Sequence, residues 1–379
     1  MKRIWANSAD SHALEPDSLF WDRMAPDLAD RMPRSVVDED GQWETIYVDG
    51  QSFRRRTPRP IREGDLAGMS MGDIFEHRAP GANDPALRLK DLDQEGIWAE
   101  VIFPSIGLWN ASIRDPGLMR EGARVVNDWA HESFLLASPR YVPTASLSLL
   151  SVDDAVHELQ RTASMGFRAV FLPPHPPLSQ PDFHRKEWDP LWSAAEDSGT
   201  IIAFHIGSEP VEIDEKRSGH LFGGPGGAVL NYVETTYGGQ RAVTKLVASG
   251  ALDRHPGLKV LVAEAGAAWA PFLGDRMNEA YRQHSAWVEP KLSLSPKEYI
   301  YRQVYASFQH DPTAVQTVVG MGWQNVLWGS DYPHLEGTFG HTQETLHELF
   351  DDVSDEVRHR ITVGAFQELF PGLGDPPTE

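Results

Sequence analysis

The amino-acid sequence predicts a closed (β/α)8 TIM barrel, and three observations lead to this α/β fold class. Eight short runs rich in apolar and β-branched residues recur along the 379-residue chain. Amphipathic helical stretches separate these runs, and such alternation is typical of a parallel sheet with right-handed crossovers. No dinucleotide-binding glycine fingerprint follows an early strand, which disfavours the runner-up, an open doubly wound sheet.

The predicted elements follow one another in chain order. We expect strands at residues 7–12, 98–103, 142–147, 168–173, 201–206, 259–264, 303–308 and 325–331. The expected helices cover residues 115–138, 152–165, 186–198, 228–250, 268–285, 311–320, 341–350 and 354–370. Because barrels of this size routinely form one domain, we expect a single domain over residues 1–379.

Two segments depart from a minimal barrel. Residues 20–90 form a long insertion after the first strand, rich in Pro, Arg and Gly. A segment that follows a barrel strand lies at the catalytic end, so we expect this insertion to cover the mouth as a lid. Residues 218–230, "SGHLFGGPGGAVL", are expected to form a second, glycine-rich lid loop. The alternative for this loop is an anion site at the start of the next helix.

Composition excludes several classes of function. The chain has no Cys, so disulfides and Cys-ligated metals are excluded and any metal must be held by His and carboxylates. The formal net charge of −21 argues against nucleic acid or an anionic membrane as a partner. No apolar run approaches the length of a membrane span and no signal peptide is apparent, so a cytoplasmic protein is expected.

Ionisable side chains follow apolar runs at four of the predicted strands. Asp10 and His12 alternate on the first strand and therefore point to the same face. The others, in chain order, are Glu15, His205, Glu264, Asp331 and His334. Because the carboxyl ends of barrel strands meet at one mouth, these side chains should converge. Burying so many charges together without a cation would be prohibitive, so a metal site is predicted, with zinc, manganese or iron suited to these ligands.

Four motifs carry a resemblance to a known family. The stretches "SADSHALEP", "IIAFHIG", "VLVAEAGAAWAP" and "VLWGSDYPHLEG" resemble the amidohydrolase-related (amidohydrolase 2) family of the amidohydrolase superfamily, from about residue 5 to residue 370. The resemblance implies a metal-dependent barrel enzyme with a small-molecule substrate, often a homodimer. It also implies that a first metal is bound by Asp10, His12, His205 and Asp331.

The sequence departs from the family pattern at two of these positions. The first strand reads Asp-x-His where His-x-His or Glu-x-His is usual, and Glu264 replaces a His at the end of the sixth strand. Glu15, Glu264 and His334 then remain as ligands for a second ion. A carboxylate-rich dinuclear site of this kind is used for di-iron oxygen chemistry in other folds. It also resembles a small oxygenase branch of the superfamily.

These departures favour an O2-dependent, non-haem dinuclear iron monooxygenase. This hypothesis assigns two transition-metal ions, iron favoured, and a small carboxylate or carrier-linked thioester substrate. It makes Glu264 and His334 the catalytic residues. Because no flavin or nicotinamide signature is present, any electrons would come from an external donor.

The alternative is a non-oxidative decarboxylase or hydrolase with one zinc or manganese ion. The metal would then polarise the substrate or a bound water, and Glu264 would act as a base. Here His334 would orient Asp331 without touching metal, and Glu15 would be a turn residue. A third hypothesis, a binding protein that has lost catalysis, is disfavoured by the nearly full ligand set.

Overall fold

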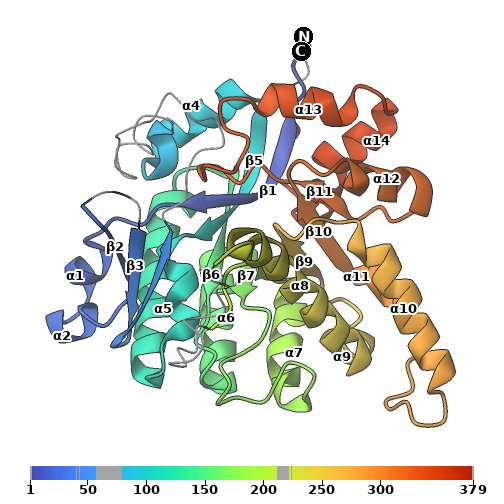
Figure 1. Cartoon of the computed structure of the whole chain (residues 1–379), viewed down its shortest axis with the longest axis horizontal. Coiled ribbons are helices and arrows are strands. Elements are labelled where there is room, and N and C mark those ends of the chain that lie inside the picture. The colour runs from blue at the N-terminus through green and yellow to red at the C-terminus, as the bar shows by residue number, and fades with distance from the viewer. Residues whose placement is uncertain are drawn as a thin grey trace.

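Eight parallel strands form one sheet that closes into a barrel, as predicted (Figure 1). The computed structural model describes residues 2–39, 41, 43–56, 79–210, 222 and 224–377. The strands are β1 (Ala6–Ala13), β5 (Ile97–Pro104), β6 (Tyr141–Ser146), β7 (Ala169–Leu172), β8 (Ile201–His205), β9 (Val260–Ala263), β10 (Val304–Phe308) and β11 (Val326–Trp328). They pair in this order, and a parallel bridge between Ser11 and Tyr332 joins the two ends of the sheet.

Helices surround the barrel, and both termini lie at the top of Figure 1. They are α4 (Pro85–Glu95), α5 (Pro116–Ala130), α6 (Val152–Met165), α7 (Asp189–Ser198), α8 (Gly227–Ala248), α9 (Ala251–Arg254), α10 (Trp269–Gln283), α11 (Pro296–Gln303), α12 (Pro312–Met321), α13 (Thr342–Phe350), α14 (Asp355–His359) and α15 (Ala365–Leu369). Local sequence sets their ends. The Asp84 carboxylate caps α4 by accepting from the amides of Ala86 and Leu87, and Gly96 ends it in the left-handed conformation.

The insertion after β1 is partly folded rather than a plain loop. It contains α1 (Leu19–Arg23), α2 (Pro26–Ala29) and an antiparallel sheet of β2 (Arg34–Val37), β3 (Trp43–Val48) and β4 (Gln51–Arg56). Sequence reasoning missed these helices and strands, and also α4 and α11. Residues 57–78 of the insertion and 211–221 and 223 around the glycine-rich loop lie outside the described residues. The two lid assignments therefore stay predictions.

The polar sequence of β1 is explained by the seam that closes the barrel. The hydroxyl oxygens of Ser8 and Ser11 lie 3.0 and 3.2 Å from that of Ser330, and the Ser330 amide donates to Ser8 Oγ at 2.9 Å. Asn7 accepts from the amide of Ala99 on β5 at 3.1 Å. These bonds satisfy buried polar groups that would otherwise destabilise the core.

A buried ion pair supports β1 from the adjoining strand and helix. Arg88 on α4 and Glu100 on β5 are both fully buried, and the guanidinium contacts both carboxylate oxygens, at 2.5 and 2.9 Å. Arg88 Nη1 also donates to the main-chain carbonyl of His12 at 2.8 Å. The guanidinium carbon lies 4.5 Å from the centre of the Tyr332 ring. One side chain therefore links α4, β5, β1 and the segment after β11.

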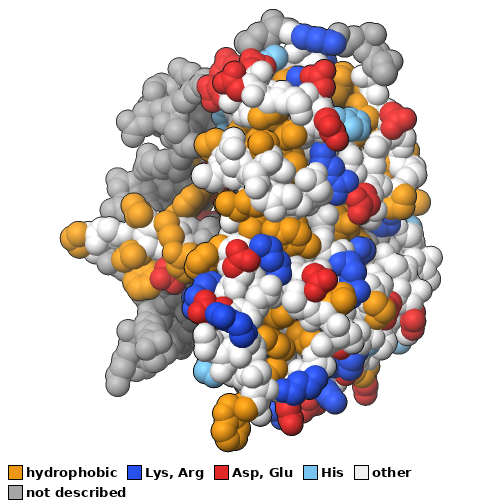
Figure 2. Space-filling model, turned by 90° about the vertical axis from the view of Figure 1, so that its right-hand side faces the viewer, with side chains coloured by type: hydrophobic (Ala, Val, Ile, Leu, Met, Phe, Trp, Pro, Cys, Tyr) orange, Lys and Arg blue, Asp and Glu red, His pale blue; other side chains and the backbone are white. Residues whose placement is uncertain are grey.

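The surface carries a mixture of charges. On the face drawn in Figure 2, acidic and basic side chains lie side by side, with hydrophobic side chains between them. Within the described ranges, no helix is both long enough and apolar enough to cross a lipid bilayer.

Replacing Arg88 should destabilise the fold strongly. We expect Arg88→Met to lower the free energy of unfolding by ~3–5 kcal/mol, because it leaves the Glu100 carboxylate buried without its partner. The matched control is Arg120→Ala, which breaks an exposed pair with Asp154 at 3.1 Å and should cost less than ~1 kcal/mol. Urea unfolding of both variants measures the difference. Equal losses of unfolding free energy would show that the buried pair stabilises the fold no more than the exposed pair does.

Candidate metal centre

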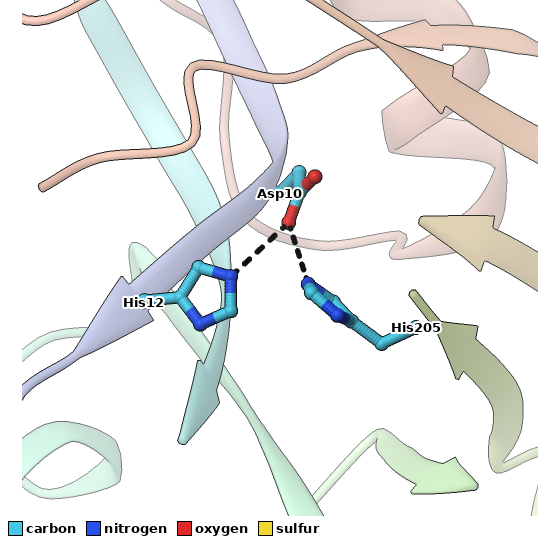
Figure 3. A group of neighbouring side chains, drawn as sticks. All are labelled: Asp10, His12 and His205. Atoms are coloured by element: carbon cyan, nitrogen blue, oxygen red, sulfur yellow. Dashed lines mark ion pairs between the residues drawn. The ribbon is translucent and has the colours of Figure 1, made fainter. Parts of the chain in front are cut away.

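The ends of three strands bring four predicted ligands together. Asp10 and His12 come from β1, His205 ends β8, and Asp331 follows β11. His205 Nε2 lies 3.4 Å from Asp10 Oδ1, and His12 Nε2 lies 3.9 Å from the same oxygen (Figure 3). His12 Nε2 is also 3.6 Å from Asp331 Oδ1. The convergence expected from the sequence is therefore present.

The donor atoms of this group are buried and lack hydrogen bonds of good geometry. They are both carboxylate oxygens of Asp10 and of Asp331, and Nε2 of His12 and His205. In both imidazoles the other nitrogen, Nδ1, faces a main-chain carbonyl, that of Pro104 at 3.4 Å and that of Ile206 at 2.6 Å. A neutral ring that donates through Nδ1 presents a lone pair at Nε2. Lone pairs then face carboxylate oxygens, an arrangement that a bound cation would stabilise, so the residues fit a metal ion.

The electrostatics point the same way. Burial raises the pKa of the Asp331 carboxyl well above its usual range, and the nearby Glu336 and Asp10 add to the shift. Burial lowers the pKa of His12 well below its usual value, reinforced by His334 and His205. Ionising Asp331 and protonating His12 are therefore both unfavourable here. A divalent cation would relieve both penalties.

His205 shifts in the opposite direction. Burial alone would lower its pKa, but the hydrogen-bonding and charge interactions with Asp10 and then Glu264 outweigh burial and raise it. A proton on His205 Nε2 would thus lie between imidazole and carboxylate, where these residues would also fit a metal ion.

Two site residues sit on strained backbone. Glu264, directly after β9, has φ +57°, and Asp331 has φ +53°. Left-handed conformations are unfavourable for residues other than Gly and gather at functional sites. Each is held by a hydrogen bond: the Glu264 amide donates to Ser307 Oγ at 3.0 Å, and the Asp331 amide donates to the Asp10 carbonyl at 2.8 Å.

Three further acidic and imidazole side chains adjoin the four-residue group. Glu264 Oε2 lies 3.6 Å from His205 Nε2. His334 Nδ1 lies 2.9 Å from Asp331 Oδ1, and its ring stacks on that of His12 with centres 4.0 Å apart. Glu336, which sequence reasoning missed, offers an oxygen within 4.8 Å of Glu264 and Asp331 oxygens. Its only signal was a second acidic residue in "SDYPHLEG".

Glu15 is the one predicted ligand that the structure does not bring to the group. Its two carboxylate oxygens accept from the amides of Ser105, Ile106 and Gly107, at 3.1, 3.0 and 2.8 Å. It connects the turn after β5 to the end of β1 by hydrogen bonds. This is the structural role that the sequence analysis gave as the alternative to metal binding.

A pocket of about 290 Å³ adjoins the group at Glu264. Its walls come from α8, from the segment after β9 and from the segment after β10. The lining side chains include Tyr232, Trp269, Phe308 and Asp311. Glu264 therefore belongs both to the ionisable group and to the pocket, which puts a carboxylate between the candidate metal position and a space for substrate.

Comparison with known proteins shows similar chains of known activity. Over 297 residues, 76% of this chain and 77% of the relative, the chain is 20% identical to the 2-amino-3-carboxymuconate-6-semialdehyde decarboxylase of Dictyostelium discoideum. An amidohydrolase of Mycobacterium avium subsp. paratuberculosis superimposes with a TM-score of 0.76 at 20% identity, covering 99% of both chains. The 5-carboxyvanillate decarboxylase of Sphingomonas paucimobilis does so with a TM-score of 0.68 at 16% identity, covering 97% and 99%.

A manganese-containing structure is also similar. The dihydroxybenzoic acid decarboxylase of Polaromonas sp. JS666, with bound manganese and an inhibitor, gives a TM-score of 0.65 at 17% identity, covering 97% of both chains. The relatives with a named activity are decarboxylases, so the predicted O2-dependent dinuclear iron monooxygenase is wrong. The assignments of iron and of an external electron donor lose their support with it. The sequence-based hypothesis gave too much weight to the number of carboxylates. One of them, Glu15, is bonded to main-chain amides.

The family itself is established by a match over most of the chain. Residues 23–371 match a family model described as Amidohydrolase, as the four sequence motifs had indicated, and the chain therefore belongs to the amidohydrolase family.

Proposed function

We propose that this chain is a metal-dependent, non-oxidative decarboxylase of a small carboxylate substrate. The observation that carries the proposal is the buried group of Asp10, His12, His205 and Asp331, whose donor atoms lack hydrogen bonds of good geometry and face one another beside a pocket. The named activities of the similar proteins support decarboxylation as the reaction.

The four residues would hold one divalent ion, and manganese or zinc suits their imidazole and carboxylate donors. Manganese is the better supported because a similar decarboxylase contains it. When bound, the ion supplies a positive charge that attracts and orients the substrate carboxylate. The oxygens of Glu264, Asp331 and Glu336 could hold a further cation. The predicted second ion is tested by counting the metal ions per chain.

Decarboxylation breaks the bond between a carbon and its carboxylate, releases CO2 and places a proton on that carbon. No oxidant or reductant is consumed. We assign the proton transfer to Glu264, because it is the member of the group that lines the pocket. Burial, and then the charges of Asp331 and Asp10, raise the pKa of Glu264 well above its usual value, which favours a carboxyl group that holds a proton. His334, beside Asp331, is assigned to orienting that carboxylate.

Hydrolysis is the second candidate, and the position of Glu264 is the reason to test it. A carboxylate next to a metal position and a pocket can also take a proton from an attacking water. The two reactions are separated by their products, because only decarboxylation releases CO2.

Removing a ligand should remove the metal. We expect Asp331→Asn and His205→Ala to lose most of the bound metal and the activity together, since each removes a donor from a buried set. His284→Ala, an exposed imidazole on the segment after α10, is the control and should keep both. Elemental analysis of purified protein gives the number of ions per chain, and full metal content in His205→Ala would contradict the assignment.

The reaction should not need oxygen. Manganese-loaded enzyme, given a panel of aromatic and unsaturated carboxylates, should release one CO2 per substrate consumed at the same rate with and without O2. The same protein is then given esters and amides of these acids. Acid release from that second panel, without CO2 from the first, would support hydrolysis and reject decarboxylation.

Glu264 should affect turnover more than metal binding. We expect Glu264→Gln to lower kcat by ~10²–10⁴-fold, the usual contribution of a proton-transfer group, while the ion at the four-residue group stays bound. Glu234→Gln, which changes an exposed carboxylate on α8, should leave kcat unchanged. A Glu264→Gln enzyme of nearly normal kcat would mean that another residue delivers the proton.

A further inference from the structure

We infer that the pocket selects substrates that place a single carboxylate toward the metal group and carry, elsewhere, a neutral or positively charged hydrogen-bond donor recognised by Asp311 on the pocket wall. This inference rests on the proposed function, since it takes the pocket beside Glu264 as the substrate site. It assigns to Asp311 a role in specificity that is separate from the metal group.

The walls of the pocket suit a flat, largely apolar ligand. Tyr232, Trp269 and Phe308 supply aromatic surface. The Trp269 indole donates to the Gly266 carbonyl at 2.8 Å, which fixes the orientation of that wall. The chain between Glu264 and Trp269 contains only Ala and Gly, so it leaves space. A volume of about 290 Å³ accommodates one small ring with its substituents.

The ionisable side chains that line this pocket are acidic. They are Glu264, to which we assign a proton, and Asp311, and no Lys or Arg from the described ranges lines the pocket. Asp311 is exposed, and no cationic side chain among the residues described in the structure forms an ion pair with it. A second carboxylate on the substrate would meet this unpaired charge, whereas an ammonium, amide or hydroxyl group would find an acceptor.

The pKa of Tyr232 reflects its burial first and the nearby acidic groups second. Its pKa is raised to about 12, first by partial burial and then by the charges of Glu264, Glu336, Asp331 and Asp311. Carboxylates from three different segments therefore act on one hydroxyl at the rim.

One feature of the fold acts in the other direction. Helix α12 begins next to Asp311, and a helix N-terminus attracts anions with about half an elementary charge. The Asp311 side chain does not cap the helix amides, so its carboxylate is not bonded there. Because a full negative charge exceeds the partial positive charge of the helix end, the repulsion of an anion should prevail.

The test uses three ligands of the same shape. They are 4-(aminomethyl)benzoate, 4-carbamoylbenzoate and terephthalate, whose far ends are cationic, neutral and anionic. Binding to the full-length, manganese-loaded protein is measured by isothermal titration calorimetry. We expect the first two to bind at least ~10-fold more tightly than terephthalate, a ratio set by the electrostatic difference at the far end.

Variants at Asp311 should change this order. Asp311→Asn should reduce the discrimination against terephthalate several-fold, and Asp311→Lys should make terephthalate the tightest ligand. The control is Asp355→Lys, the same charge change on a side chain that is 91% exposed at α14, and it should keep the wild-type order.

Each outcome is decisive for the inference. Equal binding of the three ligands by the wild-type protein, no binding of any of them, or an order that Asp311→Lys and Asp311→Asn leave unchanged would overturn it. The proposed function is judged separately by CO2 release. Loss of the ligand preference in an active decarboxylase refutes only the role of Asp311, whereas a preserved preference without CO2 release refutes only the reaction.

Discussion

The structure depends on one electrostatic constraint, the burial of two carboxylates against two imidazole lone pairs. Burial, and then the nearby Glu336 and Asp10, raise the pKa of Asp331 inside the barrel mouth, and the Nδ1 atoms of His12 and His205 already face main-chain carbonyls. Only a proton or a cation between them resolves the conflict. The arrangement fits the bound metal ion that we propose, and the cost of burying these groups has to be offset elsewhere in the fold.

The offset comes from hydrogen bonds that tie the first and last strands together. The Asp331 amide donates to the Asp10 carbonyl at 2.8 Å, so the backbones of two ligands are joined directly. Gly329 allows this close approach, because a Cβ at that position would lie 2.6 Å from Asp10 Cβ. From the other side, Arg88 donates to the His12 carbonyl. The ligands are therefore positioned by the scaffold before any ion arrives, as a precise metal site requires.

The features that could be predicted from the sequence are those that follow from hydrophobic periodicity and from the position of polar residues at strand ends. The eight strands and the convergence of Asp10, His12, His205 and Asp331 follow from burial at strand ends, because the barrel topology brings those ends together. Glu15 and Glu336 could not be sorted in this way. Both lie in segments that follow a strand, where main-chain direction decides whether a carboxylate reaches the mouth or, like Glu15, bonds to amides.

The same limit explains why the reaction was predicted wrongly. Counting carboxylates near the mouth favoured two metals and oxygen chemistry, but the number of carboxylates at a barrel mouth does not by itself distinguish an oxidative from a non-oxidative reaction. The antiparallel sheet of β2, β3 and β4 was missed for a related reason: its strands are short and half-exposed, so their pattern does not differ from that of a polar loop.

The proposed assignments would orient a substrate by the charges of the site. A cation held by the four-residue group would attract one carboxylate of a ligand, and Asp311 on the pocket wall would repel a second one. A monocarboxylate would then be favoured with its carboxylate toward the metal and next to Glu264. Because Glu264 lines the pocket and lies 3.6 Å from His205, the carbon that loses CO2 would be held near the group assigned to protonate it. Orientation and proton delivery would thus follow from the same arrangement of charges.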